Sequence, residues 1–213
     1  MRISRLLATA AAALLACASA QAADVPAIGS SASALETAGG AGGKAIHHVR
    51  GFLPDLRFTL NGAGGKTVTQ DDFKGKVVML FFGYASCPDI CPTTMAQLAQ
   101  VMQNLGSDAN RARIVFVSVD PHRDTPDKLQ AYVDVFGKNA VGLTGTPRQI
   151  ADVARRYRVA YQIEKPKAGD TENYEVAHGR GVYIFDPSGR ARLLASDANS
   201  VQAITDGVKS LLK

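Results

Sequence analysis

Runs of apolar residues alternate with amphipathic segments from about residue 76 to the end of the chain. Two runs are continuous and rich in Val, Ile and Phe, as in strands that are covered on both faces. The amphipathic segments carry apolar residues at helical spacing, and Gly or Pro bounds several of them. The predicted strands are 76–82, 113–119, 141–143, 159–163, 181–185 and 190–195. The predicted helices are 92–105, 126–136, 147–157 and 201–212.

This alternation of strands and helices predicts an α/β fold, with a sheet flanked by helices. Local signals support the boundaries, since Thr125 is a helix-capping residue ahead of Pro126 and Gly106 closes the first helix. In such folds, functional residues gather at the carboxyl ends of the strands. The segment that holds Cys87 follows one strand end, and Asp120 follows another. We therefore expect a functional site there.

The start of the chain has the features of an export signal. Arg2 and Arg5 precede an apolar run at 6–16, which is too short to span a bilayer as a stable helix. Small-x-small patterns follow and predict cleavage near Ala22, so residues 1–22 are interpreted as a signal peptide. A second interpretation is a lipoprotein signal, Leu14-Leu-Ala-Cys17, with Cys17 lipidated. Both predict an exported, periplasmic protein, either soluble or lipid-anchored.

The segment that follows, 23–45, is rich in Ala, Gly and Ser and is predicted to be a flexible linker. Residues 46–213 then have the length of one domain with a sizeable core. The whole chain of 213 residues has a formal charge of +5, and its basic residues are scattered. This distribution does not indicate a nucleic-acid-binding protein.

Two of the three cysteines, Cys87 and Cys91, lie four positions apart at the end of a predicted strand. Cys91 is expected at the first turn of the next helix, where the positive helix end favours the thiolate. If that turn is already helical, Cys87 lies over the same face. Two converging thiols can form a structural disulfide, carry out redox chemistry or hold a soft metal ion. The spacing alone leaves these three alternatives open.

A histidine is expected near this pair if the fold is thioredoxin-like. Thioredoxin-type oxidoreductases have two residues between their cysteines and a proline before a late strand, whereas this chain has three intervening residues and His178 ahead of that strand. Two thiolates and an imidazole make a site suited to copper, as Cu(I) or Cu(II), while zinc would favour a fourth ligand.

Several motifs follow one another across the predicted domain. Through these motifs and their order, the sequence resembles the Sco/SenC family of copper-handling proteins. The motifs are Phe82-Gly-Tyr-Ala-Ser-Cys-Pro-Asp-Ile-Cys-Pro92, Val117-Ser-Val-Asp-Pro-His-Arg-Asp-Thr-Pro126, Gly142-Leu-Thr-Gly-Thr146, Tyr174-Glu-Val-Ala-His178 and Val182-Tyr-Ile-Phe-Asp-Pro187. The resemblance implies a thioredoxin-like fold with a central mixed sheet. It also implies copper binding through Cys87, Cys91 and His178, the two cysteines forming a disulfide when oxidised.

The same resemblance implies a role as a copper chaperone. The expected partner is subunit II of cytochrome c oxidase, whose dinuclear copper centre the family helps to assemble, with another periplasmic copper chaperone and a thiol reductant as further partners. The alternative is a thiol–disulfide reductase that acts on the cysteines of that subunit. A thiol peroxidase and a domain braced by a disulfide are weaker alternatives.

The chain departs from the family pattern on both sides of the predicted histidine ligand. Family members commonly have an acidic residue before this histidine and Ser or Thr after it, whereas this chain has Ala177 and Gly179. We therefore expect the group that orients the imidazole to differ. The remaining histidines, His47, His48 and His122, are interpreted as surface residues.

Overall fold

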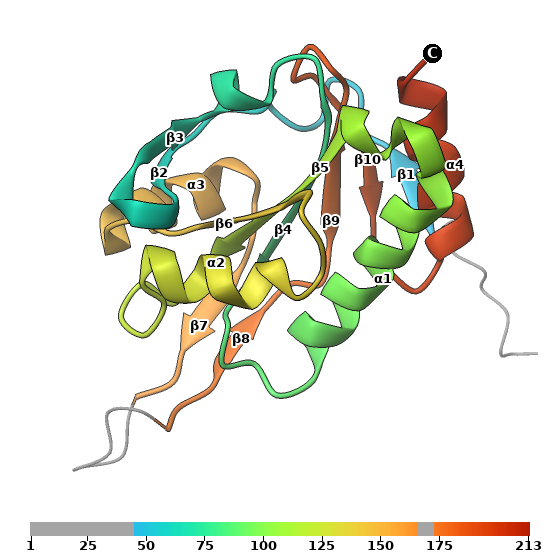
Figure 1. Cartoon of the computed structure of the whole chain (residues 1–213). Coiled ribbons are helices and arrows are strands. Elements are labelled where there is room, and N and C mark those ends of the chain that lie inside the picture. The colour runs from blue at the N-terminus through green and yellow to red at the C-terminus, as the bar shows by residue number, and fades with distance from the viewer. Residues whose placement is uncertain (1–44, 166–172) are drawn as a thin grey trace, which may run out of the picture. The chain divides into compact units, whose positions relative to one another are not determined.

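The computed structural model describes residues 45–165 and 173–213 (Figure 1). The predicted signal peptide, Cys17 and the linker up to residue 44 lie outside the described residues. The strands are β1 (Ile46–His48), β2 (Thr59–Asn61), β3 (Thr67–Thr69), β4 (Val77–Gly83), β5 (Ala112–Ser118), β6 (Ala140–Leu143), β7 (Tyr161–Ile163), β8 (Val176–His178), β9 (Val182–Phe185) and β10 (Ala191–Ala195). The α-helices are α1 (Ile90–Leu105), α2 (Pro126–Asp134), α3 (Pro147–Arg156) and α4 (Val201–Leu211), with short 3₁₀ helices at Ala63–Gly65, Gln70–Phe73 and Gly106–Arg111.

The central sheet has six strands in the order β1-β10-β9-β4-β5-β6. β4, β5 and β6 are parallel, while β9 runs antiparallel to β4 and β10 runs antiparallel to β9. Every residue of β4 is buried, because this strand lies inside the sheet and both of its faces are covered. The mixed α/β sheet that the sequence predicts is therefore confirmed.

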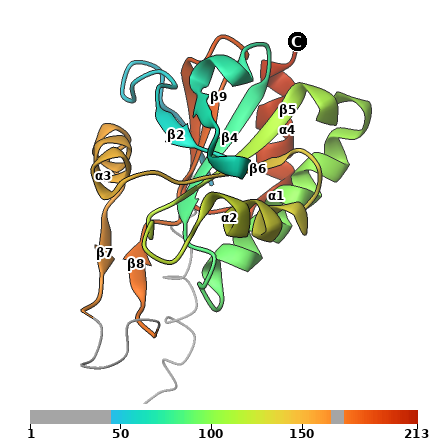
Figure 2. The ribbon, with the colours of Figure 1, turned by 60° about the vertical axis from the view of Figure 1, so that its left-hand side comes forward.

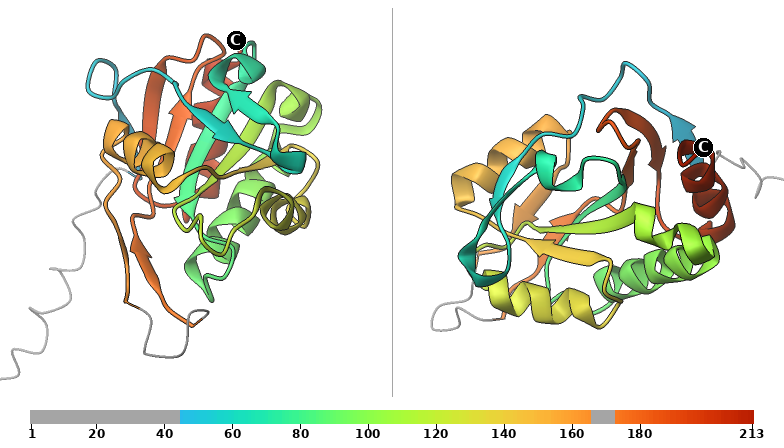
Figure 3. Two further views of the ribbon diagram at one scale, coloured as in Figure 1. Left: turned by 90° about the vertical axis from the view of Figure 1, so that its left-hand side faces the viewer. Right: turned by 45° about the horizontal axis from the view of Figure 1, so that its top comes forward.

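Helices cover both faces of this sheet. α1, α2 and α4 lie on one side and α3 lies on the other, as the views in Figure 2 and Figure 3 show. Successive side chains of a strand point to opposite faces, and β4 follows this rule. The Phe81 ring packs on Phe116, which in turn contacts Tyr132 of α2. The Phe82 ring packs instead on Tyr157, at the end of α3.

Two hairpins stand apart from the six-stranded sheet. β2 pairs with β3, and an isolated bridge between Asn61 and Thr144 connects this hairpin to the segment after β6. β7 pairs with β8 in the second hairpin, with Tyr161 opposite His178. In Figure 1 the strands β7 and β8 run side by side below the carboxyl end of β4.

The predicted elements from residue 76 onward are all present, with ends that differ by a few residues. The largest consequence is at α1, which begins at Ile90, so that Pro92 is its third residue and Cys91 lies inside the first turn. The capping predictions are confirmed, because the Thr125 side chain accepts from the Lys128 amide. The sequence patterns did not predict β1, β2, β3 or β8, which are strands of only three residues. In the part of the chain that the structure describes, no helix has the length and apolar character that crossing a membrane requires.

A candidate metal centre of two cysteines and one histidine

Cys87 lies in the connection between β4 and α1, and Cys91 lies in the first turn of α1, both beyond the carboxyl end of β4. Cys87 is half-buried in the turn, where its amide donates to the carbonyl of Tyr84, and Cys91 is fully buried. Gly83 allows the second sulfur to come close, because a Cβ at that position would lie only 2.6 Å from the Cys91 Sγ. Cys87 is not helical, so the turn rather than a helix face brings the two sulfurs together.

A buried carboxylate from the neighbouring strand end holds this turn. The Asp124 Oδ2 accepts hydrogen bonds from the Ala85 amide at 2.9 Å and from the Ser118 hydroxyl at 2.6 Å. Burial raises the pKa of Asp124, and its side chain is inaccessible to solvent. The end of β5 is thereby connected to the segment that leads into the cysteines.

His178 approaches the thiol pair from β8. Its Nε2 lies 3.2 Å from the Cys91 Sγ, and its ring contacts Phe81 and Tyr84 edge-on. The two Sγ atoms and one imidazole nitrogen all lie within 4.8 Å of one another. The structure thus brings together the three residues that the sequence singled out, and within the described residues this is the one group of three or more such side chains with that spacing.

The backbone orients the imidazole. The His178 Nδ1 lies 2.9 Å from the carbonyl oxygen of Gly179, and a carbonyl only accepts, so Nδ1 carries a proton. In the neutral ring, Nε2 is then the free acceptor, and it faces the Cys91 sulfur. The Gly179 carbonyl therefore orients the imidazole, a role that a carboxylate or hydroxyl group can also have beside a metal-binding histidine. The imidazole is therefore oriented even though Ala177 and Gly179 have no side-chain group that could hydrogen-bond to it.

Protonation in the metal-free site is governed by burial. Burial raises the pKa of the Cys91 thiol, and the nearby Cys87 sulfur raises it further. The expectation that the helix end favours a thiolate at Cys91 is therefore wrong for the metal-free protein, since desolvation outweighs the helix dipole. Burial also lowers the pKa of His178, which keeps the imidazole neutral. The site then holds a protonated Cys91 thiol that donates toward a neutral imidazole.

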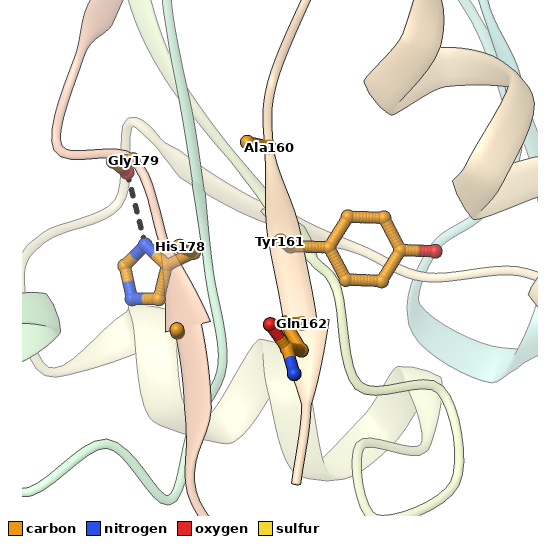
Figure 4. A pocket seen from close by; sticks show the side chains of 6 residues that line it. Ala160, Tyr161, Gln162, His178 and Gly179 are labelled. Atoms are coloured by element: carbon orange, nitrogen blue, oxygen red, sulfur yellow. Dashed lines mark hydrogen bonds between the residues drawn. The ribbon is translucent and has the colours of Figure 1, made fainter.

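Solvent reaches the site through a cleft at Cys87. The cleft has a volume of about 350 Å³, and its walls include Tyr84, Cys87 and His178. A separate hollow of about 420 Å³ lies over the β7–β8 hairpin, where Tyr161 and Gln162 line it together with His178 and its neighbours Ala177 and Gly179 (Figure 4). The sulfur of Cys87 is the more accessible of the two, because Cys91 is completely covered.

The other histidines and the methionines lie elsewhere. His47 and His48 are exposed on β1, and His122 is exposed in the turn after β5, as predicted. Met79 and Met95 are fully buried in the core, which fits packing rather than a methionine-rich metal site. The sequence patterns did not assign a structural role to Tyr174 or Arg123, which pack beside the site.

The fold and this trio define a class: a thioredoxin-like domain with a dithiol and a histidine grouped at the carboxyl end of a central strand. A family model described as SCO1/SenC matches residues 53–213. The chain belongs to the SCO1/SenC family.

Relatives support this assignment. The cattle protein named "Protein SCO2 homolog, mitochondrial" is 38% identical over 154 residues, which are 71% of this chain and 57% of that protein. "Protein SCO1 homolog 1, mitochondrial" from Arabidopsis thaliana is 37% identical over 71% of this chain and 45% of its own length. The chain thus spans about half the length of the curated relatives it matches.

Solved structures have the same fold. The structure titled Bradyrhizobium japonicum ScoI with copper bound is 34% identical, with a TM-score of 0.66 over 74% of this chain and 99% of that one. Arabidopsis thaliana ScoI with copper bound is 36% identical, with a TM-score of 0.65 over 73% and 96% of the two chains.

Proposed function

We propose that this chain is an exported copper chaperone that holds copper through Cys87, Cys91 and His178. The observation that carries the proposal is the arrangement of two sulfurs and a neutral imidazole nitrogen within 4.8 Å of one another, with the lone pair of Nε2 facing the Cys91 sulfur. Soft thiolates and imidazole are ligands that copper favours. Three ligands fall short of the four that structural zinc sites use.

The family supports the cargo and the destination. The two similar solved structures described above are copper-bound, and a third, BsSco, 25% identical, is described as a member of the Sco family of cytochrome c oxidase assembly proteins. On this basis the recipient is subunit II of cytochrome c oxidase, at its dinuclear copper centre. The predicted leader supports a periplasmic location, with or without a lipid at Cys17.

Copper titration of the reduced protein tests the proposal. A Cys17→Ser background leaves Cys87 and Cys91 as the remaining thiols, because the chain has three cysteines. One equivalent of tightly held copper is expected, lost in Cys87→Ser and Cys91→Ser and weakened, with a changed absorption spectrum, in His178→Ala. His122→Ala is the matched control, since His122 is exposed and outside the trio. Wild-type binding by His178→Ala would refute the three-ligand site.

A second function, a thiol–disulfide reductase, is favoured by the unequal exposure of the two thiols. Both cysteines are free, Cys87 borders the cleft and Cys91 is buried behind it. The Cys87 thiolate would attack a partner disulfide and release one partner thiol; Cys91 would then displace the second, leaving a Cys87–Cys91 disulfide and a partner reduced by two electrons. Reduction of a disulfide peptide from subunit II would be abolished by either Cys→Ser change. Equal activity in parent and His178→Ala would favour this function, and a loss that follows copper affinity would exclude it.

A further inference from the structure

The strand that carries His178 is not hydrogen-bonded into the central sheet. β8 pairs with β7 in a two-stranded sheet, whereas the cysteines follow β4 at the centre of the six-stranded sheet. Ladder hydrogen bonds therefore do not set the distance between His178 and the thiols. Contacts outside the ladders must hold the 3.2 Å approach between the Cys91 sulfur and the imidazole.

A cluster of Asp120, Arg123 and Tyr174 joins this hairpin to the end of β5. The Tyr174 hydroxyl donates to the Asp120 Oδ1 at 2.7 Å, and an Arg123 terminal nitrogen donates to the backbone carbonyl of Tyr174 at 2.9 Å. The Arg123 Nε donates to the Asp120 Oδ2, which closes the triangle. Tyr174 is four residues ahead of His178, so the cluster holds the hairpin at a point close to His178, the proposed metal ligand.

Burial and stacking make this connection rigid. The side chain of Asp120 is fully buried and that of Arg123 is 6% exposed. The Arg123 guanidinium lies 3.6 Å from the centre of the Tyr174 ring. Burial and the Asp120 carboxylate raise the pKa of Tyr174 to about 12, so its hydroxyl stays protonated and remains a donor.

The same arginine also reaches the cysteine side of the site. Its guanidinium is 5.4 Å from the ring of Tyr84, which begins the turn that contains Cys87. The Tyr84 ring in turn meets the His178 ring edge-on, with centres 5.8 Å apart. Arg123 thus contacts a residue on each of the two segments that supply the metal ligands.

We propose that Asp120, Arg123 and Tyr174 are positioning residues that hold the His178 hairpin against the dithiol and so set the copper affinity of the site. This inference rests on the copper site proposed above. A ligand on a hairpin that spends time away from the thiols binds only in the fraction of molecules where it is in place, and the apparent affinity falls by that fraction. The cluster raises that fraction.

A double-mutant cycle tests the inference. Tyr174→Phe removes the hydroxyl that donates to Asp120 and keeps the ring on Arg123. We expect it to weaken copper binding by about tenfold, the lower end of the effect of losing an outer-shell partner. In the His178→Ala background the same change should have no effect, because the ligand it positions is gone. An equal loss in both backgrounds, or no loss in the parent, would overturn the proposal.

Tyr161→Phe is the matched control for this experiment. Tyr161 lies on the same hairpin, directly opposite His178 in the ladder, and its hydroxyl has no hydrogen-bond partner among the described residues. In Figure 4 its ring extends away from the His178 ring. The control should bind copper as tightly as the parent, and a tenfold loss there would contradict the assignment to the Tyr174 contact.

Amide hydrogen exchange of the reduced, copper-free protein gives a second readout. In Tyr174→Phe, the amides of β8 should exchange faster while those of β4 and β5 keep their protection. Arg123→Lys, which keeps the charge and loses the planar fork, should act in the same direction. Unchanged exchange at β8, or an equal increase in all strands, would refute positioning. If the parent bound no copper, the proposed function would fail, while this exchange experiment would still test the cluster.

Discussion

Gly83→Ala tests how closely the chain packs around the buried sulfur. The backbone of Gly83 is in an ordinary extended conformation, so an alanine there meets no backbone strain. Its Cβ, however, would lie 2.6 Å from the Cys91 Sγ and 2.9 Å from the Phe116 ring. Ordinary contact begins at 3.4 Å, so the sulfur or the strand must move by about 0.8 Å.

The expected effect of this change is larger on copper than on the fold. Overpacking a core costs about 1–3 kcal/mol of unfolding free energy. Metal–ligand distances tolerate only about 0.2 Å, so a sulfur displaced several times further should lower copper affinity by at least about tenfold. Denaturant unfolding measures the first quantity, and competition with a chelator of known affinity measures the second.

Gly179→Ala is the matched control for Gly83→Ala. It is adjacent to His178, a Cβ there would contact nothing within 4 Å, and the carbonyl that orients the imidazole is retained. This variant should keep parental stability and copper affinity. Parental copper affinity in Gly83→Ala would refute the argument, because it would mean that the Cys91 sulfur moves without cost to the ligand set.

Three further predictions concern protons, the cysteine turn and a distant turn. Copper affinity should fall by at least about tenfold per pH unit from about pH 8 to about pH 6, because burial raises the pKa of the Cys91 thiol and the metal must displace its proton. Because the pKa of His178 is lowered, protonation of its imidazole should reduce copper affinity further only at more acidic pH. A copper affinity that does not change with pH, measured by competition with a chelator, would contradict this. Asp124→Ala leaves one buried and one half-buried donor without their acceptor and should cost about 2–4 kcal/mol in denaturant unfolding, with Asp124→Asn costing less than half as much; equal losses would contradict a hydrogen-bonding role. Asp186→Ala removes the acceptor of Arg190 and Arg192 in the β9–β10 turn and should lower stability by about 1–3 kcal/mol without changing copper affinity; a change in copper binding would show that the turn communicates with the site.

Much of the fold could be predicted from local sequence patterns. The long buried strands β4 and β5 have continuous apolar runs, and α2 and α3 begin with Thr-Pro, where capping and the fixed φ of proline act within a few residues. The short strands β1 and β8 escaped prediction, because three residues are too few for a periodic pattern, whereas the alternation that predicted β7 extends over residues 159–163. β1 pairs with β10, far away in the chain, and β8 pairs with β7 within one hairpin.

The candidate ligand residues could likewise be named from the sequence, because the chain has only three cysteines, two of them four positions apart, and the late histidine occurs in a recognisable motif. The protonation state of these residues could not be predicted from the sequence. The helix position of Cys91 predicted a thiolate, yet burial by residues distant in sequence raises the pKa of that thiol. Desolvation is a property of the assembled core, and no local pattern reports it.

The sequence by itself therefore determined the fold class, the order of the main strands and helices, and the three residues of the candidate metal centre. Only the tertiary structure decided how they meet: the Gly179 carbonyl that fixes the imidazole, the close approach at Gly83, and the cluster around Arg123 that joins the hairpin to β5. The physical reason is the distance along the chain over which each interaction acts. Capping, hydrophobic periodicity and proline geometry act over a few residues, whereas desolvation and buried hydrogen bonds depend on neighbours that only folding brings together.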